Sequence, residues 1–138
     1  MAVNPQFTST PNNAMVRITD ADSLATEDWT AGASGGRLHQ VYARVAADQA
    51  VIVNIFVKVG AAVYQIVRTV PPQIPIADED TSTQPPTPLL TDINFPGLAQ
   101  TPEGRALTFP AGDGIRMSIG TTLDAGEKVT LLALGGDF

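Results

Sequence analysis

Residues 107–138, LTFPAGDGIRMSIGTTLDAGEKVTLLALGGDF, decide the fold that we expect for this chain. Two segments within them, 114–120 and 128–135, alternate apolar and polar residues, and this period of two is typical of a half-buried antiparallel strand. In the first segment the residues expected to face the core are Ile115, Met117 and Ile119. The short connection between the segments predicts a hairpin, and the residues after it are expected to form a free tail.

Three more strands are predicted upstream of this hairpin. Residues 37–46, 50–60 and 62–70 are rich in β-branched and aromatic residues, which favour strands. The expected apolar face of the middle strand is Val51, Val53, Ile55, Val57 and Val59. Because short turns separate the three segments, we expect a meander of adjacent antiparallel strands.

A proline-rich connection, residues 71–88, follows the meander. Proline cannot donate a hydrogen bond to a sheet, so the strand must end there. Connections of this length are unusual in compact domains and are mostly functional or disordered. We expect this one to cross from one sheet to another, and we expect short strands after it at 89–93 and 106–109.

The N-terminal part of the chain has a weaker pattern. Residues 1–13 are mostly polar and predict an extended arm, whereas 14–19 alternate and predict a short edge strand. Residues 20–36 read as a polar, glycine-rich connection with Trp29 in its middle. One helical turn is expected between Ser23 and Trp29, because serine is a good helix cap and acidic residues follow it.

Together these segments predict an all-β protein with about eight short strands. Turn signals between short strands and the absence of long helical patterns favour an antiparallel β-sandwich, and two groups of strands joined by a long crossing loop favour the jelly-roll type. We divide the chain into an N-terminal arm and loop, 1–34, and a β-sandwich domain, 35–138.

Composition excludes several classes of function. The chain has 138 residues, a net charge of −6, and only eight scattered basic residues, so nucleic acid is not an expected partner. It has no cysteine, no N-terminal pattern of a secretory signal, and no apolar run long enough for a membrane span. Charged residues make up only 16% of the chain, which suggests that other subunits cover part of its surface. We expect a protein that is made and assembled in the cytoplasm and does not bind a membrane.

The residues that could carry chemistry do not form a recognisable catalytic or metal-binding pattern. His39 is the single histidine and lies within a predicted strand, and one histidine without cysteine makes a zinc site improbable. Acidic groups at 20–22, 27–28 and 78–80 are candidates for calcium, although their spacing does not match an EF-hand. We therefore predict a protein that is not an enzyme and has no metal or cofactor.

Interaction remains as the expected function. Trp29, Tyr42 and Tyr64 could together form a stacking platform for a carbohydrate, which is one alternative. The preferred interpretation is assembly through the extended segments, because an arm and a tail can wrap around neighbouring subunits in a symmetric particle. The residues predicted to contact partners are Phe7, Trp29 and Phe138.

The sequence from about residue 35 onward also resembles small structural proteins of tailed bacteriophages. The matching pieces, in order, are Gly35-Gly36-Arg37-Leu38, the strand Val51–Val59, the turn Pro110-Ala111-Gly112-Asp113 and the ending Gly135-Gly136-Asp137-Phe138. The resemblance implies a virion protein on the capsid surface, most like a decoration (cement) protein that binds the major capsid protein as a homotrimer. A tail or head–tail connector component is the second structural alternative.

Overall fold

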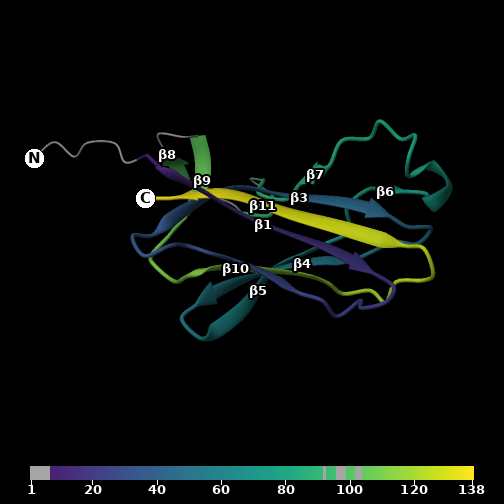
Figure 1. Ribbon diagram of the computed structural model, residues 1–138, viewed down its shortest axis with the longest axis horizontal. Coiled ribbons are helices and arrows are strands. Elements are labelled where there is room, and N and C mark those ends of the chain that lie inside the picture. The colour runs from purple at the N-terminus through teal and green to yellow at the C-terminus, as the bar shows by residue number, and fades with distance from the viewer. Residues whose placement is uncertain (1–6, 92, 96–98, 102–103) are drawn as a thin grey trace, which may run out of the picture.

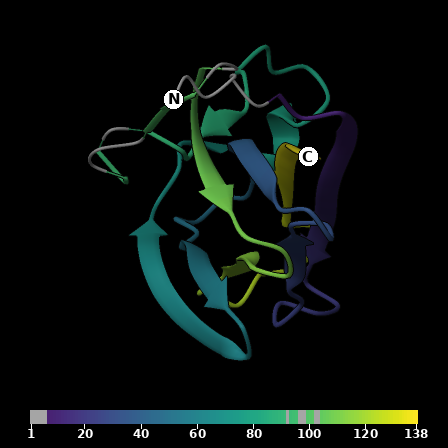
Figure 2. The same ribbon diagram turned by 90° about the vertical axis from the view of Figure 1, so that its left-hand side faces the viewer.

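The computed structural model describes residues 7–91, 93–95, 99–101 and 104–138 of the chain. These residues form an all-β, sandwich-like structure of two sheets and contain no α-helix, which confirms the all-β part of the prediction (Figure 1). The start of the first strand and the C-terminus lie at the same end of the molecule, as Figure 1 shows. The two layers are seen end-on in Figure 2.

The larger sheet has seven strands and the smaller sheet has four. The main row of the larger sheet is, in order, β1 (Thr10–Thr19), β11 (Lys128–Asp137), β3 (Gly36–Ala46), β9 (Gly104–Phe109) and β8 (Ala99–Thr101). Two short strands, β6 (Gln73–Ile74) and β7 (Thr87–Pro88), also pair with β3. The row of the smaller sheet is β2 (Glu27–Thr30), β10 (Gly114–Ile119), β4 (Val53–Val59) and β5 (Ala62–Thr69). Every pairing is antiparallel except the short one between β3 and β6.

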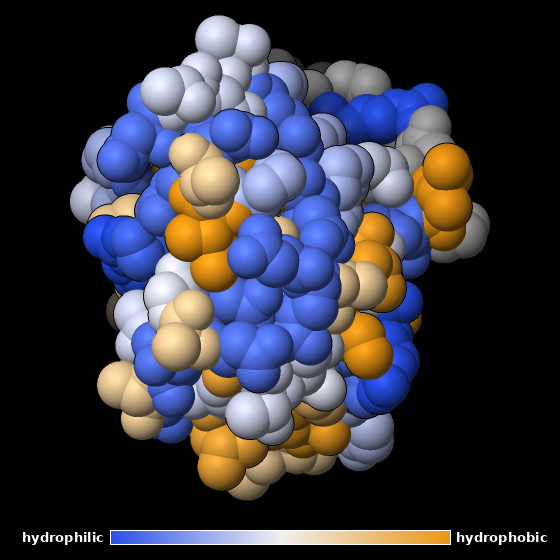
Figure 3. All heavy atoms as spheres, turned by 90° about the vertical axis from the view of Figure 1, so that its right-hand side faces the viewer, coloured by the Kyte–Doolittle hydropathy of each residue, from blue (hydrophilic) through white to orange (hydrophobic). Residues whose placement is uncertain are grey.

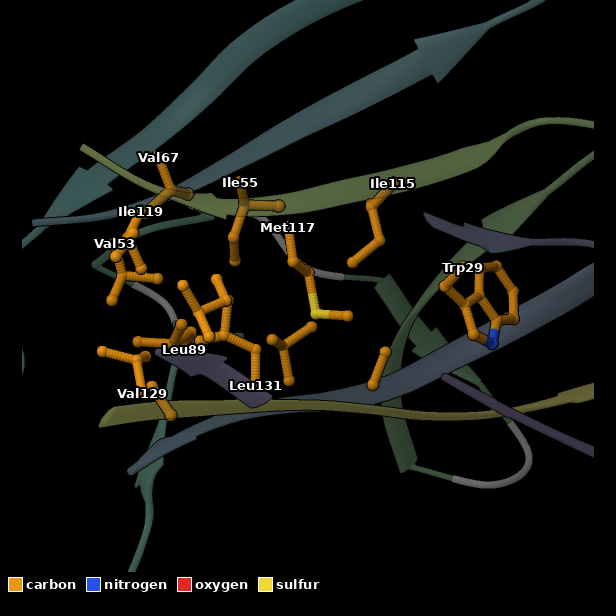
Figure 4. Close-up of a cluster of buried hydrophobic side chains, with 14 of the residues drawn as sticks. Trp29, Val53, Ile55, Val67, Leu89, Ile115, Met117, Ile119, Val129 and Leu131 are labelled. Atoms are coloured by element: carbon orange, nitrogen blue, oxygen red, sulfur yellow. The ribbon is translucent and has the colours of Figure 1, made fainter. Parts of the chain in front are cut away.

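A single hydrophobic core lies between the two sheets. Figure 4 shows side chains from β4, β5 and β10 facing side chains from β11, with Trp29 at one end of the cluster. Ile115, Met117 and Ile119 are buried while the residues between them are only partly buried, so the predicted alternation of this strand is confirmed. The contacts of these side chains across the sandwich join the two sheets, since apolar burial is the main favourable term in folding.

The predicted face of β4 is buried only in part. Val51, Val53 and Ile55 are fully buried, but Val57 is partly exposed and Val59 is exposed. The exposure increases toward the turn at Gly60, where β4 and β5 form a hairpin. The apolar pattern of this strand therefore continues beyond the core onto the surface.

The predicted hairpin at the end of the chain is wrong. β10 pairs with β2 and β4 in the smaller sheet, whereas β11 pairs with β1 and β3 in the larger one. The predicted meander is wrong at its first connection, because β3 and β4 lie in opposite sheets, whereas the antiparallel pairing of β4 with β5 is confirmed. The two strands of each wrongly predicted pair lie in opposite sheets and bury their apolar faces against each other across the core. Alternation within a strand does not reveal in which sheet the strand lies.

Two further local predictions need correction. Residues Glu27–Thr30 form the strand β2, which pairs with β10, instead of the end of a helical turn. The strands are also more numerous than the eight predicted. The additional ones, such as β6, β7 and β8, are only two or three residues long and leave no periodic pattern in the sequence.

The long connection 71–88 crosses between the sheets, as predicted. It leaves β5 in the smaller sheet and reaches β6, which lies beside β3 in the larger sheet. A short 3-10 helix, η1 (Ile76–Asp78), and β7 follow, and β7 again pairs with β3. The connection is thus attached to the larger sheet at both of its ends.

Candidate functional site

The N-terminal strand extends further than expected and is fixed by Trp29. β1 begins at Thr10 and pairs with β11 along its whole length, so residues 10–13 belong to the sheet and not to the predicted arm. Trp29 is fully buried, and its Nε1 donates a hydrogen bond to the carbonyl of Asn12 over 2.7 Å. Its ring centroid lies 5.8 Å from that of Phe109. Trp29 therefore pins the N-terminal strand to the core of its own subunit.

The Gly-Gly-Asp-Phe ending is not a free tail. β11 contains its first three residues and lies between β1 and β3. The Asp137 carboxylate accepts hydrogen bonds from the Asn12 side chain over 2.9 Å and from the Gly32 amide over 3.0 Å. A Cβ at Gly135 would lie 2.7 Å from Cζ2 of Trp29, so glycine is needed for the close approach of this ring.

Phe7 and Phe138 lie next to the paired ends of β1 and β11, where Thr10 is opposite Asp137. Phe7 is 59% exposed, and the chain beside it is held by the Ser9 amide, which donates to the Asp137 carbonyl over 2.8 Å. Phe138 is partly buried, its amide donates to the Gly35 carbonyl over 3.2 Å, and the guanidinium of Arg37 lies 4.9 Å from its ring centroid. Of the three predicted contact residues, Phe7 is thus the most exposed.

Exposed apolar side chains gather along one edge of the smaller sheet. Among the described residues, nine large hydrophobic side chains are exposed, and five of these lie between residues 59 and 70. β5 is the terminal strand of its sheet, so its outer edge also presents backbone groups to the surroundings. We call this region the β5 surface; its exposed side chains are Val59, Val63, Tyr64, Ile66 and Val70.

The outer face of the smaller sheet carries an ion-pair cluster. Arg116 on β10 donates two hydrogen bonds to the Asp28 carboxylate, from Nε over 2.8 Å and from a terminal nitrogen over 3.1 Å. Lys58 on β4 lies 3.3 Å from the same carboxylate and also donates to the Thr30 hydroxyl. The hydrogen bond from Arg116 is the main cause that lowers the pKa of Asp28; partial burial opposes it and Lys58 reinforces it. This cluster links three neighbouring strands and has the geometry of a structural contact.

A buried carboxylate holds two loops together at the end of the sandwich where β11 begins. Glu127 is 1% exposed, and it accepts hydrogen bonds from the amides of Asp48 and Asp124 and from the Gln49 side chain, over 2.6 to 2.8 Å. Burial acts to raise the pKa of Glu127, but these hydrogen bonds together outweigh it, so the pKa is lowered. Figure 3 shows that the surface at this end is largely hydrophilic.

Several of the acidic residues considered for calcium already have cationic partners. Asp28 pairs with Arg116 and Lys58, and Glu79 lies 3.0 Å from Nζ of Lys128. In the described part of the chain no group of three or more histidine, aspartate or glutamate side chains is arranged to hold a metal ion. His39 is partly buried on β3. No helix among the described residues has the length and apolar character needed to cross a membrane.

The three aromatic residues of the carbohydrate alternative do not share one face. Trp29 is inside the core, Tyr42 lies on the outer face of the larger sheet beside Leu132, and Tyr64 lies on β5 in the smaller sheet. The geometry therefore brings no two of these rings together as a platform.

Sequence reasoning missed the β5 surface and the role of Glu127. A signal for the β5 surface was present, because the segment 62–70 has apolar residues at adjacent positions, which cannot all face one core.

Comparison with known protein families finds no matching family, and comparison with curated proteins finds no significant match.

Proposed function

We propose that the chain is a non-enzymatic virion structural protein of a tailed bacteriophage, which binds the capsid surface as a decoration (cement) protein. The resemblance of residues 35–138 to small phage structural proteins supports the identity of the class. The β5 surface carries the functional part of the proposal, because several exposed apolar side chains on and beside an edge strand are typical of a site that another protein covers.

We infer that the sandwich is of the jelly-roll type. Support comes from the strand order when β6, β7 and β8 are set aside. The larger sheet then reads β1-β11-β3-β9 and the smaller reads β2-β10-β4-β5, so successive strands pass from one sheet to the other at β1–β2, β3–β4 and β10–β11. Jelly rolls occur in viral capsid proteins and in lectins, which fits a role in particle assembly.

The proposed oligomer is a homotrimer that associates through the β5 surface. Tyr64 and Ile66 have the largest exposed apolar side chains on β5, at 59% and 51% exposure. Arg68 is the single charged residue of this strand, so little charge has to be desolvated when the surface is covered. Tyrosine is among the residues that contribute most to the binding energy of protein interfaces, and burial of an aliphatic side chain beside it adds to that energy.

The proposed contact with the major capsid protein lies at the end of the molecule where Thr10 of β1 pairs with Asp137 of β11. Phe7 is exposed and precedes β1 there, so its side chain is available to a partner. Trp29 is left out of this contact because its side chain is fully buried within its own subunit.

The test of the proposal combines oligomer mass with particle binding. Light scattering of the wild-type chain is expected to give a mass three times the 14.4 kDa of one chain. The double variant Tyr64→Lys/Ile66→Lys is expected to have the mass of a single chain. The matched control is Leu24→Lys, which changes a side chain that is 89% exposed outside the β5 surface. The wild-type chain should sediment with phage capsids that lack it. A monomeric wild-type chain that does not bind capsids would refute the proposal.

A further inference from the structure

The outer face of the larger sheet contains a shallow pocket of about 140 Å³. Its walls come from β3, from β11 and from the proline-rich connection that follows β5. The lining residues are Tyr42, Arg44, Pro86, Thr130 and Leu132. The pocket lies on a different face from the β5 surface, and neither the core nor the Phe7 end of the molecule uses it.

The pocket continues into a row of apolar side chains across the sheet. Strand register places Met15 of β1 beside Leu132 of β11, Leu132 beside Tyr42 of β3, and Tyr42 beside Pro88 of β7. Met15 is 65% exposed, so the row is open to solvent at that side. Residues that are directly opposite on neighbouring strands form one surface, and the pocket is the hollow within it.

The wall of the pocket is fixed by ion pairs and strand pairing. Glu79 follows the 3-10 helix of the connection, and its carboxylate lies 3.0 and 3.1 Å from Nζ of Lys128 and 3.7 Å from a terminal nitrogen of Arg17. Arg44 donates to the Glu79 carbonyl over 2.8 Å. Since β6 and β7 also pair with β3, the connection is held against the sheet, and a pre-formed site loses less entropy on binding.

Two arginines lie beside the apolar row, and the acidic run 78–80 of the connection lies near them. Strand register places Arg17 and Arg44 on either side of Thr130, two residues along the strands from the row. In the described part of the chain the partner of Arg44 is a neutral group, the Glu79 carbonyl. The side chain of Arg17 is 58% exposed, and its ion pair with Glu79 is long. Asp78 and Asp80 flank Glu79 but form no ion pair with these arginines.

We propose that this pocket recognises an apolar side chain next to carboxylates, in a segment of the protein on which the chain assembles. The apolar row favours an aliphatic or aromatic side chain, and the two arginines favour acidic neighbours and repel basic ones. The chain's own residues 1–7 do not fit this description, since they contain no carboxylate. The identity of the partner as a capsid protein rests on the proposed function, whereas the preference of the pocket does not.

The test is an NMR titration of the ¹⁵N-labelled full chain with three capped peptides, Ac-Glu-Leu-Glu-amide, Ac-Lys-Leu-Lys-amide and Ac-Glu-Gly-Glu-amide. We expect the first peptide to shift amide signals of β3 and β11 around Tyr42 and Leu132. The lysine peptide should bind at least about fivefold more weakly, the effect of roughly 1 kcal/mol for one exposed ion pair. The glycine peptide should also bind more weakly, because it has no apolar side chain to bury in the pocket. Equal shifts with the lysine peptide, or shifts spread over the β5 surface, would overturn the inference.

Charge-reversal variants make the test specific. Arg17→Glu is expected to weaken binding of the glutamate peptide about fivefold, since it replaces an attraction by a repulsion at an exposed position. The variant loses the long ion pair with Glu79, but the Lys128–Glu79 pair and the pairing of β6 and β7 with β3 still hold the wall. Arg68→Glu, at an exposed position of the other sheet, is the matched control and should leave binding unchanged. Equal affinities of the two variants would contradict the inference. Particle sedimentation is measured separately, so failure of the pocket and failure of the decoration function are distinguishable.

Discussion

Replacement of the buried Glu127 should destabilise the fold at neutral pH and much less in acid. In Glu127→Ala the amides of Asp48 and Asp124 and the side chain of Gln49 lose their acceptor. An unsatisfied buried donor costs about 1–3 kcal/mol, and water reaches these loops in part, so we expect a loss of roughly 2–4 kcal/mol at pH 7. Urea unfolding at a fixed protein concentration measures this difference.

The pH dependence follows from the direction of the pKa shift. Hydrogen bonding lowers the pKa of Glu127 below the ordinary value of 4.5. A lowered pKa in the folded state means that the stabilisation is fully present above about pH 4.5 and is lost as the pH falls through the folded-state value. The gap between wild type and Glu127→Ala should therefore narrow in acid.

Glu127→Gln is the control, because it keeps the shape of the side chain but offers one acceptor atom in place of two. It should fall between wild type and the alanine variant at pH 7. If Glu127→Ala costs less than about 0.5 kcal/mol, the typical effect of a neutral surface change, or if its effect is the same at pH 7 and pH 3, the assigned contacts do not stabilise the fold.

Three other variants test the packing. Gly135→Ala should lower the free energy of unfolding by roughly 1–3 kcal/mol in urea, because the new Cβ would collide with the Trp29 ring; an unchanged midpoint would contradict this close approach. Trp29→Phe should cost a similar amount, roughly 1–3 kcal/mol, since the Asn12 carbonyl loses its donor, and hydrogen exchange should rise in β1; unchanged β1 protection would count against the anchoring role. Asp28→Asn should cost no more than about 1 kcal/mol and less still in high salt, because its pair with Arg116 is partly exposed; a larger, salt-independent loss would mean that the cluster is more than a surface ion pair.

Alternation allowed the strands to be predicted but not their partners. Ile115, Met117 and Ile119 face the core as expected, because burial on one face leaves a period of two in the sequence. The connection after β10 runs from Gly120 to Glu127, and a loop of this length fits either a wide hairpin or a crossing between sheets. The choice depends on the contacts of Glu127 with Asp48 and Gln49 and on pairing with distant strands, and the local sequence reveals neither.

The candidate site was predictable only in part. The sequence predicts partner contacts at the terminal aromatic residues Phe7 and Phe138, and both lie near the paired ends of β1 and β11. The sequence predicts a polar loop around Trp29, whereas the burial of Trp29 depends on glycines of β3 and β11 that are distant in sequence. The β5 surface depends on β5 being an edge strand, which only the sheet order reveals.

The most direct test of the decoration function is a cryo-electron microscopy map of the intact phage particle that contains this chain. We predict density for the sandwich on the outer capsid surface, in groups of three copies whose β5 surfaces face one another and whose Phe7 ends contact the major capsid protein. Density at the tail or connector, or copies on the capsid with the β5 surface open to solvent, would contradict this account.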